Sequence, residues 1–264
     1  MSRVTGLTND VRRDLRGAAI AHERLVVGLA GLIDDEVRRP SLLPDWTIAH
    51  TLTHIARNAD SHVLMLEAAS RGEIGAQYPG GMGQRNADIE AGVGRPADEL
   101  VADIIESNSR LEAAWLAMTD KGWEGEGLSV FGPVPINDLP FRRWRETVVH
   151  HADLGLAYSW RDWPADYVRV ELTRRTMEWA SRQPMGLTTL PPFALALSEH
   201  ERVAWLLGRA TVEGLDAAGI FGCGSVAGVS LSRLSALRRY WAQRHARCQR
   251  MPNSKPAPHR PTAS

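Results

Sequence analysis

Three residues from two separate parts of the sequence could hold a metal ion together. Glu146 and His150 stand four residues apart in a helix expected over about 137–158, so both side chains project from one face. His54 lies in the middle of another expected helix, beside apolar residues that should face the core. Two histidines and one carboxylate suit zinc and leave a fourth position for water or a substrate. The spacing alone leaves two alternatives open, because such a Glu–His pair is often a surface ion pair and a core histidine is often simply hydrogen-bonded.

Polar residues beside these three have simpler interpretations. His50, one turn before His54, is expected to cap its helix or to support a ligand rather than to be a fourth ligand. Asp153 follows His150 by three residues, so it could orient a ligand or an arginine, or form a hydrogen bond at the helix end. His151 points about a quarter turn away from His150, which predicts a surface position.

Long helices must position these side chains, and the spacing of apolar residues predicts four of them. The expected ranges are 9–35, 46–70, 96–116 and 137–158. A glycine-rich connection over 71–95, with a short helix around 84–91, separates the second from the third. The pattern predicts a mainly α protein whose N-terminal part is an antiparallel four-helix bundle with one long crossover.

The pattern changes after Pro164, where helices expected over 167–181 and 199–207 are separated by short apolar pieces that prolines punctuate. We therefore predict a bundle domain over 1–160 and a smaller α+β domain over 161–222. Residues 223–264 are basic and contain several prolines, which predicts a partly disordered tail. The sequence contains no phosphate-binding loop and no dinucleotide glycine fingerprint, and this argues against nucleotide-binding functions.

Composition narrows the class of protein further. The 264 residues are 44% hydrophobic and 23% charged, which is typical of an ordinary globular protein. The formal net charge of zero hides a basic C-terminal tail, but this tail carries no recognition motif, so we expect no nucleic-acid or membrane partner. Apolar runs are shorter than the roughly 20 residues that a bilayer requires, and no secretory signal is visible, so we expect a cytoplasmic protein. The two cysteines, Cys223 and Cys248, form no CxxC pair, so a metal would use histidines and carboxylates. Either a monomer or a homodimer fits the sequence.

Several motifs around the candidate ligands resemble the mycothiol-dependent maleylpyruvate isomerase family, which belongs to the DinB/YfiT-like superfamily of metal-binding four-helix bundles. Leu43-Pro44-Asp45-Trp46-Thr47, followed by His50 and His54, is similar to the family's helix-two signature. Arg85-Asn86-Ala87-Asp88-Ile89 is similar to the segment after its loop, and Arg145-Glu146, His150 and Asp153-Leu154-Gly155 resemble its fourth-helix motif. The resemblance covers roughly the first 160 residues, and a shorter match lies at Trp205-Leu206-Leu207-Gly208-Arg209.

This resemblance implies a zinc ion held by His54, Glu146 and His150, with Arg209 facing it from the C-terminal domain. In the family reaction, part of gentisate catabolism, a mycothiol thiolate adds reversibly to the cis double bond of maleylpyruvate. Rotation about the new single bond and loss of the thiol then give fumarylpyruvate. Arg209 would bind a substrate carboxylate and stabilise the charge that develops.

The residues leave alternatives open for the thiol and for the reaction. Glutathione, bacillithiol or ergothioneine could replace mycothiol, and the same zinc-held thiolate could be transferred to an electrophile in a detoxifying S-transferase. A non-enzymatic zinc-binding regulator would also retain the three ligands. In a bundle that binds no metal, Glu146 would simply pair with Arg142 or Arg143.

Overall fold

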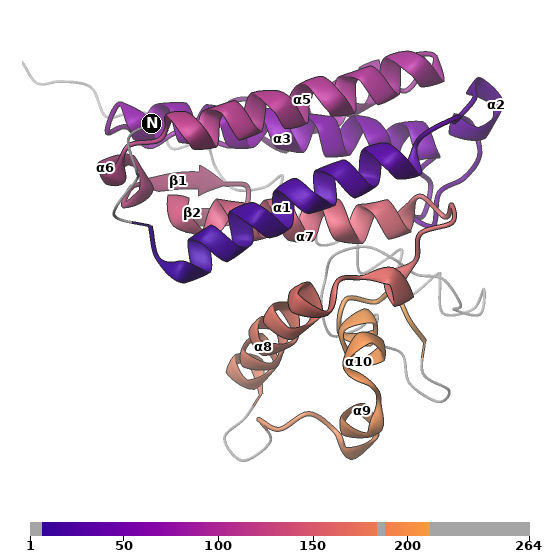
Figure 1. The fold of residues 1–264 in the computed structure, drawn as a ribbon, viewed down its shortest axis with the longest axis vertical. Coiled ribbons are helices and arrows are strands. Elements are labelled where there is room, and N and C mark those ends of the chain that lie inside the picture. Colours follow the sequence, from indigo (N-terminus) through magenta and orange to yellow (C-terminus); the bar gives the residue numbers. More distant parts are fainter. Residues whose placement is uncertain (1–6, 184–187, 212–264) are drawn as a thin grey trace, which may run out of the picture. The chain divides into compact units, whose positions relative to one another are not determined.

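The computed structural model describes residues 7–183 and 188–211, and these are mainly helical (Figure 1). All of them fall within the first of two compact units of the chain, residues 1–225. The predicted tail over 223–264 lies outside the described residues. The predicted boundary at residue 160 stays a prediction.

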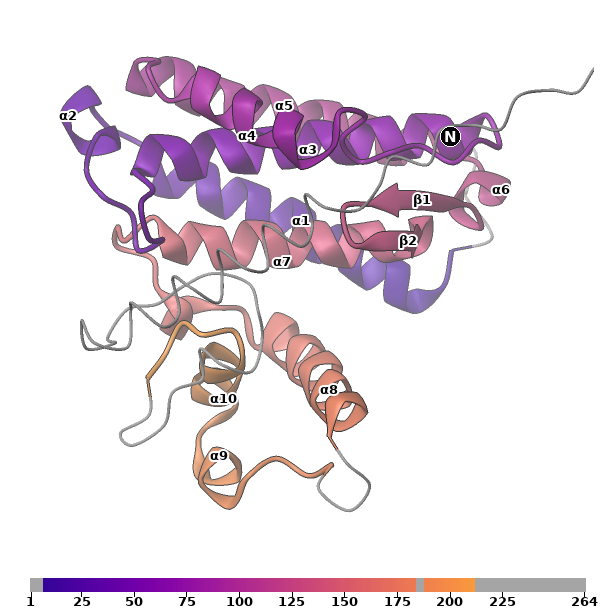
Figure 2. The same cartoon turned by 180° about the vertical axis from the view of Figure 1, so that it is seen from behind.

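Four long helices build the part of the fold that carries the candidate ligands. They are α1 (Asn9–Gly28), α3 (Ile48–Ser70), α5 (Ala97–Ala117) and α7 (Leu139–Asp153). The most extensive contacts are those of α3 with α5 and of α1 with α7, and both views of the ribbon show these helices side by side (Figures 1 and 2). The prediction of a mainly helical protein with a four-helix bundle is confirmed.

Helix ends differ from the predicted ones for identifiable reasons. The range 9–35 is not one helix: α1 stops at Gly28, Gly31 adopts a positive φ of 82°, and a separate short helix α2 (Asp34–Val37) follows. The helix that carries His54 is capped by Thr47, whose hydroxyl accepts a hydrogen bond from the backbone N–H of His50 at 3.4 Å.

Shorter elements connect the long helices. The glycine-rich connection contains α4 (Gly81–Gly92), close to the short helix predicted there, and α4 packs on α3. Between α5 and α7 lie α6 (Asp120–Trp123), the antiparallel strands β1 (Glu126–Ser129) and β2 (Gly132–Pro135), and a 3-10 turn, η1 (Ile136–Asp138). Leu25, Leu52, Ile55, Ile104 and Trp144 are among the residues that fill the bundle interior.

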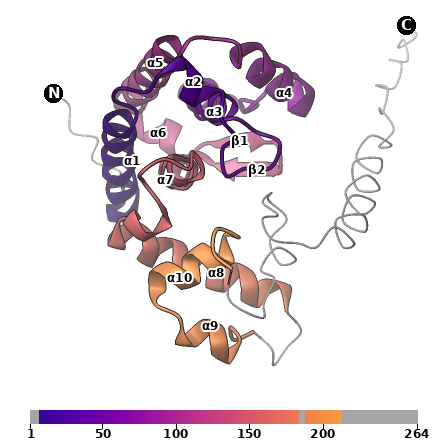
Figure 3. The same ribbon diagram turned by 90° about the vertical axis from the view of Figure 1, so that its right-hand side faces the viewer.

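The chain after the bundle is helical wherever it is described. It forms η2 (Trp160–Asp162), α8 (Ala165–Arg182), α9 (Pro192–Ala196) and α10 (Glu199–Leu206), with α8 beside α10 (Figure 3). The strands predicted for this part are not found within 161–183 and 188–211. Pro192, one of the prolines that punctuate this part, stands at the first position of α9, where its missing N–H does no harm, so it begins a helix. No helix within the described ranges has the length and apolar character needed to cross a membrane.

Candidate metal centre

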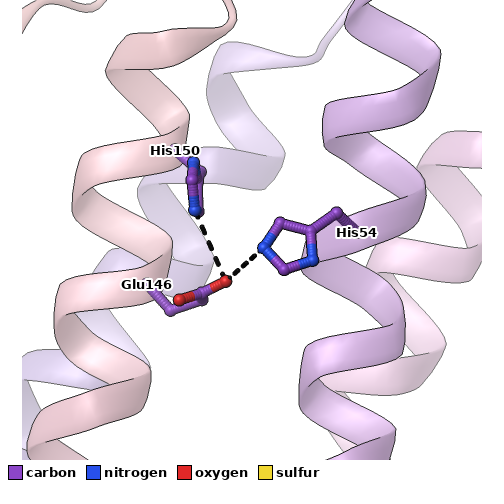
Figure 4. Close-up of side chains that lie close together, drawn as sticks. All are labelled: His54, Glu146 and His150. Atoms are coloured by element: carbon purple, nitrogen blue, oxygen red, sulfur yellow. Dashed lines mark ion pairs between the residues drawn. The ribbon is translucent and has the colours of Figure 1, made fainter. Parts of the chain in front are cut away.

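His54, Glu146 and His150 meet between two facing helices. His54 comes from α3, while Glu146 and His150 lie one turn apart on α7, and the three side chains point toward one another (Figure 4). Oε1 of Glu146 lies 2.6 Å from Nε2 of His54 and 3.5 Å from Nε2 of His150. One ligand atom from each residue lies within 4.8 Å of the other two. The three residues that the sequence singled out are therefore brought together, and their binding of a metal remains a prediction.

The Glu146 carboxylate shows that these residues suit a cation. Its Oε1 is buried and lies between two imidazole nitrogens, Nε2 of His54 and Nε2 of His150. With both nitrogens unprotonated, these atoms present three lone pairs to one point, which a cation between the side chains would satisfy. Two nitrogens and one oxygen are a common zinc donor set. The side chains of Glu146 and His150 are 21% and 16% exposed, so one side of the centre is reachable from solvent.

Burial and nearby charges set the protonation states of this centre. Burial lowers the pKa of His54 to about 4, and the negative charge of Glu146 offsets only part of this effect. Burial by itself would raise the pKa of Glu146, but the adjacent His150, His54 and Arg143 outweigh it and lower the pKa. At neutral pH His54 is therefore neutral and Glu146 ionised, which are the forms that bind a metal.

Asp153 and Arg209 support His150 from behind. Nδ1 of His150 lies 2.8 Å from Oδ2 of Asp153, and Arg209 donates to both oxygens of the same carboxylate, at 3.0 Å and 2.7 Å. Burial would raise the pKa of Asp153, but these hydrogen bonds outweigh it and lower the pKa to about 2. An ionised Asp153 accepts the Nδ1 proton of His150, so Nε2 of that ring presents its lone pair toward the centre. Arg209, expected to face the metal, lies against Asp153 in the structure.

Comparison with known proteins supports the interpretation of this part of the chain. A family model described as "Mycothiol maleylpyruvate isomerase N-terminal domain" matches residues 18–155, a range that contains all three candidate ligands. The chain belongs to this family. The comparison with curated proteins gives no match.

Two solved structures are similar to this member of the mycothiol maleylpyruvate isomerase family over most of their length. One is the crystal structure of the mycothiol-dependent maleylpyruvate isomerase, with 25% sequence identity and a TM-score of 0.69. The other is a histidine-to-alanine mutant of such an enzyme, with 23% identity and a TM-score of 0.67, which is evidence for the fold alone. Each match covers 80% of this chain and 93% of the solved chain.

The two other histidines near the family's fourth-helix and helix-two motifs have structural roles. Nδ1 of His50 accepts a hydrogen bond from the backbone N–H of Thr47 at 3.1 Å, so the structure gives His50 the capping role that was one of its two expected roles. The prediction of a surface position for His151 is wrong: this side chain is buried and stacks on Tyr158 with ring centroids 4.0 Å apart. The face of α7 that carries His151 points to the interior, because α1 packs against that side of the helix.

Two residues that were given no chemical role lie against His54. Nη2 of Arg85, on α4, is 3.2 Å from Nδ1 of His54. The ring of Trp46 is half-buried and stands edge-on to His54, with centroids 5.4 Å apart. The available signal for Arg85 was its position in a segment that resembles the family, within the glycine-rich connection.

Proposed function

We propose that this protein is a zinc-dependent cis–trans isomerase that converts maleylpyruvate to fumarylpyruvate with a low-molecular-weight thiol, mycothiol being the first choice. The observation that carries the proposal is the convergence of Oε1 of Glu146 with Nε2 of His54 and Nε2 of His150, at 2.6 Å and 3.5 Å, in the bundle interior. Membership of the family and the similarity to a mycothiol-dependent maleylpyruvate isomerase support the choice of reaction.

The chain's own residues prepare this centre for a metal with an open position. A zinc ion held by His54, Glu146 and His150 would lower the pKa of a bound thiol and keep it as a thiolate at neutral pH. Burial keeps the imidazole of His54 neutral, and Asp153 fixes the ring orientation of His150. The overall change is an isomerisation in which the thiol is regenerated.

Arg209 acts in this proposal as a positioning residue. Both of its hydrogen bonds to Asp153 hold the carboxylate that orients His150, and a third goes to the backbone carbonyl of Leu207 at 2.7 Å. A guanidinium engaged in this way supports a ligand of the metal rather than binding a substrate carboxylate at the same time. This role replaces the substrate-binding role that the resemblance implied for Arg209.

The surroundings of Glu146 argue against a bundle that binds no metal. In such a bundle, Glu146 would pair with Arg142 or Arg143. Arg142 instead pairs with Asp138 at 2.8 Å, while Arg143 is buried and donates to Asn58 and Asn108 at 3.0 Å and 2.7 Å. Glu146 is thus directed at the two histidines.

The proposal can be tested by following the loss of maleylpyruvate absorbance with purified, zinc-loaded protein. Mycothiol, glutathione, bacillithiol, ergothioneine and no thiol would be compared, and zinc content would be measured on the same samples. His54→Ala removes a ligand and should abolish both zinc binding and turnover. His200→Gln, on α10, is the matched control: the His200 ring contacts the carbonyl of Trp163 at 2.9 Å, away from the centre, so zinc content and turnover should persist.

Each outcome of this assay decides between the proposed function and its alternatives. Turnover that requires one thiol and disappears in His54→Ala would establish the isomerase and its thiol together. Bound zinc without turnover in any thiol would overturn the isomerase proposal in favour of an S-transferase for another electrophile or a zinc-binding regulator. Wild-type protein that binds no zinc would overturn the metal centre itself.

A further inference from the structure

Arg85 brings a guanidinium group to the edge of the candidate metal centre. It belongs to α4, and its Nη2 lies 3.2 Å from Nδ1 of His54. Its Nη1 lies 3.0 Å from the side-chain oxygen of Asn86, and its Cζ is 5.8 Å from the centroid of the Trp46 ring. The side chain is half-buried, so it borders both the centre and the solvent.

The charge of Arg85 is not neutralised by a carboxylate of the described residues, unlike the charges of Arg145 and Arg209. Arg209 is held by Asp153, and Arg145 is paired with Glu171 at 2.8 Å. For Arg85, no carboxylate lies within ion-pair distance in the ranges 7–183 and 188–211. A partly exposed guanidinium beside a candidate catalytic centre, with no carboxylate to neutralise it, is suited to bind an anionic ligand.

Hydrogen-bond chemistry indicates that the contact between Arg85 and His54 is temporary. A guanidinium can only donate, so Nδ1 of His54 must accept and the ring proton must sit on Nε2. A metal bound through Nε2 requires the opposite tautomer, with the proton on Nδ1. The Nδ1–H of His54 and an Nη2–H of Arg85 would then point at each other, and neither can accept. His150 has no such conflict, because Asp153 accepts its Nδ1 proton. Metal binding therefore requires Arg85 to move away from His54.

We propose that Arg85 is the carboxylate-binding residue of this site, which leaves His54 when the metal binds and then holds a carboxylate of a small dicarboxylate ligand. The identity of that ligand as maleylpyruvate rests on the proposed function. Trp46 contacts the guanidinium through its ring, and such a contact leaves the N–H groups in the guanidinium plane available for two parallel hydrogen bonds to a carboxylate.

Equilibrium binding of a non-reacting dicarboxylate tests the proposal without turnover. Zinc-loaded protein without thiol would be titrated with succinate and with maleate in a calorimeter. Arg85→Gln should weaken binding about 10- to 100-fold, the loss expected for a charge-assisted hydrogen-bonded pair, and Arg85→Lys should restore part of it. Arg71→Gln is the control, because Arg71 is exposed and pairs with the exposed Glu73, so binding should be unchanged.

Two further measurements separate this role from support of the metal. Arg85→Gln should bind zinc at least as tightly as the wild type in a chelator competition, because the donor that opposes the required tautomer of His54 is removed. In the isomerase assay the same variant should raise KM for maleylpyruvate more than it lowers kcat.

The outcomes distinguish a failure of this inference from a failure of the proposed function. Equal dicarboxylate affinity in the wild type and Arg85→Gln, or no dicarboxylate binding by either, would overturn the role of Arg85. A large loss of zinc affinity in Arg85→Gln would also overturn it, since Arg85 would then support the ligand His54. Dicarboxylate binding that depends on Arg85, in a protein that does not isomerise maleylpyruvate, would support Arg85 and refute only the isomerase.

Discussion

Replacing Asp153 by asparagine should weaken zinc binding, because the carboxylate fixes the orientation of a ligand. Asp153 accepts hydrogen bonds from His150 and Arg209, and its side chain is only 3% exposed. An amide of the same shape presents one oxygen and one N–H₂ group, so either His150 or Arg209 would face a donor. Loss of such a supporting contact reduces metal affinity about 10- to 100-fold, or roughly 1.4 to 2.8 kcal/mol.

The same substitution should also lower the stability of the fold. The pKa of Asp153 falls from 3.8 to about 2 on folding, because the hydrogen bonds from His150 and Arg209 outweigh the opposing effect of burial. This difference corresponds to roughly 2 kcal/mol. Because the pKa is depressed in the folded state, this contribution is complete above pH 3.8 and is lost as the pH falls through about 2. Asp153→Asn should lack it at neutral pH.

Chelator competition and urea unfolding at neutral pH separate the two effects. Asp138→Asn is the matched control: Asp138 precedes the same helix and also binds two arginines, Arg142 at 2.8 Å and Arg174 at 2.6 Å, but it does not contact a candidate ligand. Both variants should lose stability, and only Asp153→Asn should lose zinc affinity. Unchanged zinc affinity in Asp153→Asn would refute the reasoning and leave Asp153 a purely structural role.

Three further predictions concern the bundle. Arg143→Met removes a buried cation that holds polar groups on three other helices, so urea unfolding should show a loss of about 3 to 5 kcal/mol, and a neutral effect would contradict this. Gly17→Ala would place a Cβ 2.4 Å from the ring of Trp144 and should cost about 1 to 3 kcal/mol, whereas Gly83→Ala, in open space on a helix, should be neutral or mildly stabilising in the same assay. Burial lowers the pKa of His62 from 6.5 to about 3, so the free energy of unfolding should fall as the pH drops below 6.5. In His62→Gln, the dependence of this free energy on pH should be smaller by up to about 1.4 kcal/mol per pH unit. An unchanged pH dependence would contradict this role of His62.

The helices were predictable because local spacing sets them. Apolar residues at helical intervals gave the starts of the four bundle helices to within a few residues, but the first and fourth helices end earlier than predicted, at Gly28 and Asp153. Ends were less predictable, since they depend on single backbone conformations such as the positive φ of Gly31. The part after Pro164 was predicted as α+β from short apolar pieces between prolines, and short apolar pieces do not distinguish strands from short helices such as α9.

The sequence by itself determined that Glu146 and His150 share a helix face, because that spacing is a property of the helix alone. Apolar spacing also placed His54 near the core-facing side of a second helix, and resemblance to a family favoured it as a third ligand and added Arg209. Only the tertiary structure decided which side chain Arg209 holds and which arginine lies against His54. These partners are 56 and 31 residues apart in the chain, and such contacts depend on how helices pack rather than on any local pattern.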